Sequence, residues 1–168
     1  MKKTQKLTFI ALFVAQGLVL YMVERMIPVP FITPGAKLGL TNIVTLLALY
    51  MFDFKDVFLI IVLRVILSTL LGGTLSSFLY SIAGGMLSFI AMYVMKKIGK
   101  DQISIIGISI VGSVFHNIGQ IIVAALVIEN VMIVAYLPVL LIAALGTGFF
   151  VGLTSKYLFP FMKRITQN

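Results

Sequence analysis

Long apolar stretches alternate with short polar or proline-rich segments along the whole chain. Six stretches are apolar enough to be interpreted as membrane-crossing helices: residues 7–23, 38–52, 57–71, 75–95, 103–128 and 138–158. A hydrocarbon core of roughly 30 Å requires about 17–25 helical residues, and lipid offers no water to the backbone, so each stretch is predicted to be helical. We therefore expect an all-α integral membrane protein, a six-transmembrane-helix bundle that forms a single membrane domain over residues 1–168.

The amino-acid composition points to the same fold class. Of the 168 residues, 61% are hydrophobic and 11% are charged, whereas an ordinary soluble domain has about 25% charged residues. A soluble fold of this size has no way to bury so much apolar surface. The sequence contains no cysteine, which excludes disulfides, thiolate metal sites and thiol catalysis.

The net charge of +8 is distributed between the two sides of the predicted bundle, whereas nucleic-acid binding would need it gathered on one exposed face. With six crossings, ten basic residues fall on one side: Lys2, Lys3, Lys6, Lys55, Lys96, Lys97, Lys100, Lys156, Lys163 and Arg164. Arg25 and Lys37 fall on the other side. The positive-inside rule then predicts that both termini are cytoplasmic. The first stretch is interpreted as a retained helix and not as a cleaved signal peptide.

Two largely apolar segments are expected on the outer side. Residues 24–37 contain three prolines and Gly35, which oppose a regular helix and favour a fixed extended loop. Residues 129–137 are expected to pack back onto the helices. Together the two segments are predicted to roof a pocket that faces outward.

Polar side chains inside the predicted spans are the strongest functional signal, because an ionisable group in hydrocarbon costs at least roughly 2.5–3.5 kcal/mol. The deepest is Arg64. The residues predicted to reach overlapping depth are Lys37, Asn42, Tyr80, His116, Asn117 and Gln120. This set predicts an outward-open site for a small ligand, and its donors favour an anionic or acceptor-rich one. The alternative is a hydrogen-bonded network that only holds the helices together.

Patterns of catalytic or metal-binding residues are missing from the sequence. The spans contain no pair of carboxylates at helical spacing, no Glu-x-x-His arrangement and no Gly-rich phosphate loop with its lysine. Asp53 and Asp56 flank a predicted turn and are interpreted as helix-end residues. We therefore expect no enzymatic activity, no metal and no cofactor.

Three motifs occur in order along the chain: PGAKLGLTNIVTL at residues 34–46, FLYSIAGG at residues 78–85 and HNIGQ at residues 116–120. Together with the six-span layout they resemble the Gx transporter family, which is related to the substrate-binding S components of energy-coupling factor (ECF) transporters. Members are often labelled heptaprenyl diphosphate synthase component I. Chain-elongating prenyl synthases use aspartate-rich Mg²⁺ motifs, however, and this chain has no two adjacent acids.

The resemblance implies a multi-pass protein of the bacterial plasma membrane that holds a vitamin- or cofactor-sized ligand near its outer face. It also implies that Ala11 and Ala15 dock an ECF transmembrane coupling subunit, which is driven by two cytoplasmic ATPases. Flavin-like molecules and prenyl or quinone precursors are the ligands that the family's associations suggest. The alternative function is a membrane anchor or interaction subunit of a flavin-, quinone- or prenyl diphosphate-linked complex, with the polar residues serving structure alone.

Overall fold

The computed structural model describes residues 3–27, 37–100 and 102–167, and all regular secondary structure within these ranges is helical. The elements are α1 (Lys3–Met26), α2 (Asn42–Met51), α3 (Phe54–Leu70), α4 (Leu75–Gly99), α5 (Ile105–Val127), the 3-10 helix η1 (Val131–Tyr136) and α6 (Leu137–Gln167). The prediction of an all-α protein with six helices is confirmed.

Helix length divides these elements into two groups, and α3, with 17 residues, belongs with α2 to the shorter one. Helices α1, α4, α5 and the continuous run of η1 and α6 are long and apolar enough to cross a membrane. Helix α2 has ten residues and is therefore about 15 Å long, roughly half of a hydrocarbon core. The predicted span 38–52 begins too early, because Gly39 has a φ of +86° and the chain forms a turn up to Thr41.

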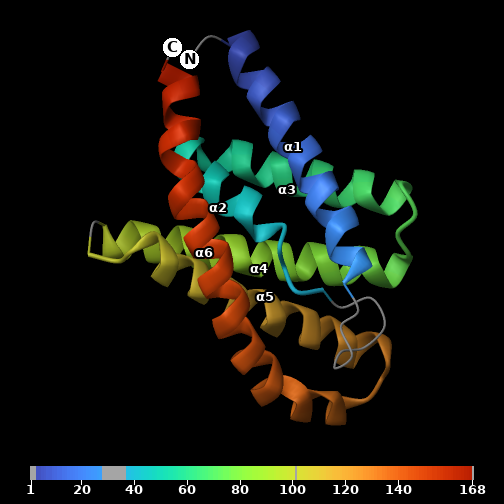
Figure 1. Ribbon diagram of the computed structural model, residues 1–168. Helices are drawn as coiled ribbons and strands as arrows, with labels where there is room; N and C mark the ends of the chain where they lie inside the picture. The colour runs from blue at the N-terminus through green and yellow to red at the C-terminus, as the bar shows by residue number, and fades with distance from the viewer. Residues whose placement is uncertain (1–2, 28–36, 101, 168) are drawn as a thin grey trace.

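The helices pack as a series of neighbours. The most extensive contacts join α4 to α5 and α5 to α6, while α1 lies mainly against α3 and the short α2 contacts all five other α-helices. Figure 1 shows α3 and α4 running side by side, with α1 crossing α3 at a steep angle. The start of α1 and the end of α6 lie at the same end of the picture.

Small residues allow α6 to approach α5 closely. A Cβ atom at Gly148 would lie 2.7 Å from the Cα of Ile110, and one at Gly152 would lie 2.7 Å from the Cα of Ile106. Ala144, one turn before Gly148, is fully buried. Any larger residue at either glycine would push the two helices apart. Small residues permit close helix approach in the same way in other membrane proteins.

An apolar core joins all six helices. Its largest fully buried side chains include Phe13, Leu46, Ile60, Phe89, Ile108 and Val151. Many large apolar side chains are exposed instead, for example Leu70 at 76% and Ile142 at 72%. A water-soluble monomer rarely exposes so much apolar surface, whereas lipid solvates it, so the molecule is a membrane protein in contact with the bilayer.

Of the two segments predicted to roof an outward-facing pocket, the structure describes mainly the second. Most of the first segment, residues 28–36, lies outside the described residues. The second segment contains η1, which contacts α5 and α6 but has no buried residue. Val131 and Met132 are 77% and 82% exposed. The Asn130 side chain accepts a hydrogen bond from the backbone N–H of Met132 at the start of this short 3-10 helix.

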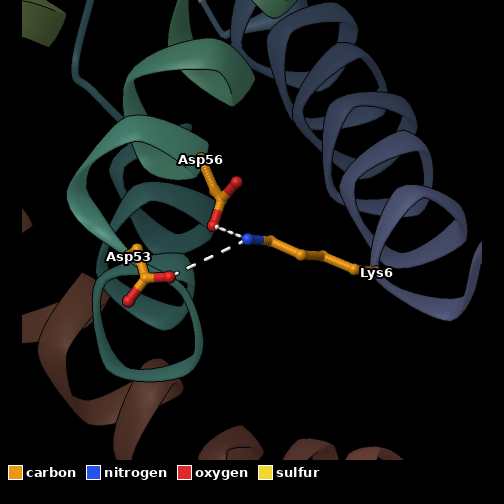
Figure 2. Close-up of polar contacts among 3 residues, drawn as sticks. All are labelled: Lys6, Asp53 and Asp56. Carbon is orange, nitrogen blue, oxygen red and sulfur yellow. Dashed lines mark ion pairs between the residues drawn. The ribbon is translucent and has the colours of Figure 1, made fainter. Parts of the chain in front are cut away.

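Three charged side chains tie α1 to the turn between α2 and α3 (Figure 2). Lys6 Nζ lies 2.6 Å from a carboxylate oxygen of Asp56 and 3.8 Å from one of Asp53. Asp53 directly precedes α3 and Asp56 lies in its first turn, where the helix dipole favours negative charge. We call Lys6, Asp53 and Asp56 the ion-pair cluster.

Candidate functional site

A cavity opens between α1, α3, α4, α5 and the segment that precedes α2. It is lined by Tyr21, Glu24, Lys37, Thr41, Arg64, Val65, Ser68, Ser81 and His116. The space between these side chains, including the open mouth, is about 300 Å³. Most of this space is too narrow for a solvent molecule, and only about one water molecule fits in it. A larger ligand therefore requires the lining side chains to move.

Arg64 of α3 is 5% exposed and lies in a groove made by glycines of two neighbouring helices. A Cβ atom at Gly17 of α1 would collide with the Arg64 side chain, and one at Gly85 of α4 would lie 3.5 Å from Nη2. The buried Arg64 Nε has no hydrogen-bond partner among the residues that the structure describes. Two helices thus make room for a positive charge whose hydrogen-bonding capacity is not used within that part of the chain.

Glu24 lies in the last turn of α1 and is 3% exposed. Its Oε1 accepts hydrogen bonds from the backbone N–H groups of Gly39 and Leu40, the latter at 3.2 Å. These bonds fix the turn that brings Lys37 and Thr41 to the cavity. Sequence analysis did not place Glu24 in the site, although a lone acid at the end of an apolar helix was a signal for it.

Lys37 connects the segment before α2 to three helices. Its Nζ donates to Ser81 Oγ at 2.6 Å and lies 4.2 Å from the centre of the Tyr21 ring, and its backbone N–H donates to Gln120 Oε1 at 3.2 Å. Burial lowers the pKa of Lys37 to about 8, and the nearby cation Arg64 acts in the same direction, whereas the Glu24 carboxylate opposes the shift. Lys37, one of the predicted site residues, is thus among those that line the cavity.

His116 and Gln120 lie one turn apart on α5 and contact each other. Because Gln120 Oε1 accepts the Lys37 N–H, its amide nitrogen faces His116 Nε2, at 2.9 Å. This contact matches the neutral tautomer in which the histidine Nε2 accepts and Nδ1 carries the proton, and Nδ1 has no hydrogen-bond partner among the described residues. Gly84 of α4 makes room for the ring, since a Cβ there would lie 2.9 Å from Nδ1.

The remaining predicted site residues do not line the cavity. Asn117 Nδ2 donates to the backbone oxygen of Leu140 at 2.7 Å, so it joins α5 to α6. Tyr80 is 2% exposed and lies in the protein interior. Asn42 is also buried, next to the turn at Gly39, and neither of its side-chain polar atoms has a hydrogen-bond partner among the described residues. The structure thus brings Lys37, Arg64 and His116 together, with Gln120 in contact through two of them.

Ala11 and Ala15 lie on the outer surface of α1. Both are exposed, whereas Phe13, Val14 and Gly17 on the same helix are buried. The small face of α1 is therefore not used for packing among the described residues. It is free to contact lipid or another helix.

The cavity holds two basic side chains and one acidic one, Lys37, Arg64 and Glu24, which we call the cavity cluster. Within the described residues the ion pairs closer than 4 Å are those of Lys6, so no such pair joins members of the cavity cluster. In the same part of the chain no three His, Cys, Asp or Glu side chains gather in a way that would hold a metal. The arrangement is suited to binding a polar molecule with at least one negative group.

Comparison with known proteins identifies a family. A family model described as heptaprenyl diphosphate synthase component I matches residues 13–158, which includes all the cavity-lining residues. No curated protein and no solved structure matches the chain. Since the matched region covers most of the 168 residues, the chain belongs to this family, the Gx transporter family that its three motifs resemble.

Proposed function

We propose that this protein is the substrate-binding S component of an ECF-type transporter, and that it binds a small vitamin- or cofactor-related molecule from the outer side of the bacterial plasma membrane. The observation that carries the proposal is a pair of cations, the buried Arg64 and the partly buried Lys37, in one cavity of a membrane protein. Both termini and the ion-pair cluster would lie on the cytoplasmic side, and Lys37 would lie toward the outside.

The cost of a buried cation favours a ligand over a purely structural role. A structural network in lipid has to satisfy its own donors and acceptors, as Asn117 does with Leu140. Arg64 Nε is instead buried and unpartnered among the described residues. An anionic or acceptor-rich ligand would supply what the described protein does not.

The protein is proposed to have no enzymatic step of its own, in spite of the word synthase in the family description. A prenyl synthase binds diphosphate through Mg²⁺ on clustered carboxylates. The acids in the described residues are separated: Glu24 lies at the cavity, Asp53 and Asp56 pair with Lys6, and Glu129 is exposed. Transport energy would come from ATPases that act through a coupling subunit.

Native mass spectrometry of the gently purified protein tests this function. The wild type should retain a small molecule, Arg64→Met should lose it, and Lys55→Met, which removes an exposed cation, should keep it. A wild-type protein that carries no small molecule, or an Arg64→Met protein that retains it equally well, would count against a substrate-binding role.

A further inference from the structure

Glu24 presents an unused hydrogen-bond acceptor to the same cavity that holds the two cations. One carboxylate oxygen, Oε1, accepts the backbone N–H groups of Gly39 and Leu40. The other oxygen, Oε2, is buried and has no hydrogen-bond partner among the described residues. A buried carboxylate oxygen without a donor is costly, so this atom is a candidate contact for a ligand.

The hydrogen-bond acceptor Glu24 and the donor Arg64 line the same cavity without forming a hydrogen bond with each other. Glu24 and Arg64 both line the cavity, and both have a buried polar atom without a partner in the described part of the chain. Lys37, the third charge, is directed to Ser81 and the Tyr21 ring. Had the cluster served only to neutralise itself, an ion pair between Glu24 and Arg64 would be the expected arrangement.

On the basis of the proposed function, we infer that the ligand is amphoteric: an anionic group binds between Arg64 and Lys37, and an N–H or O–H group of the same molecule donates to Glu24 Oε2. A ligand that is only anionic would face the carboxylate of Glu24 and leave it without a donor. An isoprenoid diphosphate is such a ligand, because its tail has no donor. Among the described residues, Tyr21 and Val65 are also the only large apolar side chains that line the cavity, too few for a long tail. The cavity therefore favours a polar ring or amino-acid-like molecule.

Glu24→Gln separates this contact from the structural role of Glu24. The glutamine oxygen can still accept from the N–H groups of Gly39 and Leu40, so the turn before α2 keeps its hydrogen bonds. In place of Oε2 the variant presents an NH₂ group, which donates and does not accept. Glu129→Gln is the matched control, because Glu129 is an exposed acid outside the cavity.

The probe is the molecule that co-purifies with the wild type, released with methanol, identified by tandem mass spectrometry and added back to ligand-free protein. We expect it to contain both an anionic group and an N–H or O–H donor. It should bind Glu24→Gln at least about tenfold more weakly than wild type, as for a lost hydrogen bond to a charged group, and bind Glu129→Gln normally. An analogue with its donor methylated should lose a similar factor on the wild type.

The outcomes distinguish this inference from the proposed function. Equal binding to wild type and Glu24→Gln, or a molecule without a donor, overturns the inference and leaves the binding function standing. Retained binding in Glu24→Gln would also be the result if Glu24 were a protonated donor, which glutamine mimics. A wild type that carries no molecule overturns both. If Glu24→Gln does not fold, the methylated analogue decides, and unchanged affinity for it overturns the inference.

Discussion

The ion-pair cluster has one cation and two acids, and the cavity cluster has two cations and one acid. The charges of the first are paired, whereas those of the second are not. In the first, one cation lies between two acids, 2.6 Å from Asp56, and Asp53 is 90% exposed at its side chain. In the second, two cations and Glu24 line one cavity with no ion pair closer than 4 Å in the described chain.

If the cavity cluster served only to hold the helices together, its charges would be expected to pair as closely as those of Lys6 and Asp56 do. A buried charge needs a close partner more than an exposed one does. Both clusters include a residue of α1, Lys6 near its start and Glu24 near its end. The paired cluster is therefore suited to fixing the helix, and the unpaired one to receiving a ligand.

The largest effect is expected on the surface of α1 that lies between the two clusters. Ala11→Leu combined with Ala15→Leu should abolish co-purification with a co-expressed coupling subunit, because the added side chains prevent close helix approach. Both clusters face away from this surface, so retention of the small molecule should be unchanged. Affinity capture followed by quantitative mass spectrometry measures both quantities.

The matched control for this variant places leucines on another exposed small surface. Ala143→Leu combined with Gly146→Leu changes α6, where Gly146 has no neighbour that a Cβ would meet within 4 Å. This control should keep the coupling subunit. Loss of the subunit in the control, or its retention by the α1 variant, would mean that Ala11 and Ala15 form no specific docking surface.

A loss of affinity without a loss of stability is expected for Arg64→Met. Removing a hydrogen bond to a charged group weakens binding by about 1.5–3 kcal/mol, which is about 10- to 150-fold. The ligand-free variant should melt at the same temperature as wild type or higher, since an unpaired buried charge has been removed. Isothermal titration with the co-purified molecule and thermal melting in detergent measure the two effects.

Asn117→Leu gives the contrasting structural case for the Arg64 variant. It removes the hydrogen bond from α5 to the Leu140 oxygen, which is a direct polar contact between α5 and α6, so the melting temperature should fall. If Arg64→Met lost as much stability as Asn117→Leu and showed no specific effect on binding, the cavity cluster would be a structural network like the Asn117 contact.

Opposite pH trends in binding and stability are expected from Lys37. The pKa of Lys37 in the folded protein is about 8, below its usual value of 10.5. The contribution of Lys37 to the free energy of unfolding is therefore greatest above pH 10.5, and it is lost as the pH falls to about 8. Anion binding needs the charged form, so affinity should fall about tenfold between pH 7 and 9. Lys37→Met, measured with the same molecule, should lack both trends, and a wild-type affinity trend that persists in this variant would belong to the ligand.

Much of the fold could be predicted because long apolar runs leave the backbone few alternatives in lipid. The start of α2 could not be predicted, since residues 38–41 continue the apolar pattern while Gly39, with its positive φ, turns the chain. That turn depends on hydrogen bonds to Glu24, which is distant in sequence. Local patterns do not contain such long-range contacts.

Part of the candidate site could be predicted from residues whose polar side chains are costly to place in the membrane, whatever direction they face. Lys37, Arg64 and His116 were expected at one depth, and they line one cavity. Asn117 was placed in the same set because it is three residues from Gln120, but its amide faces α6. Spacing along a helix identifies a shared sector of the surface, while the neighbouring helix decides what each side chain in that sector contacts.

The smallest effect is expected in the ion-pair cluster, where it completes the contrast with Arg64. Lys6→Met removes a cation whose side chain is 37% exposed and whose partners Asp53 and Asp56 have side chains that are 90% and 15% exposed. Because solvent screens such pairs, the melting temperature should fall only slightly, and the difference from wild type should shrink as salt is added. The sign is opposite to that of Arg64→Met, and the co-purified molecule should bind with unchanged affinity. Thermal melting in low and high salt makes the measurement. A loss larger than that of Asn117→Leu, or one insensitive to salt, would show that the paired charges are as important to the fold as a buried contact, and the distinction between the two clusters would fail.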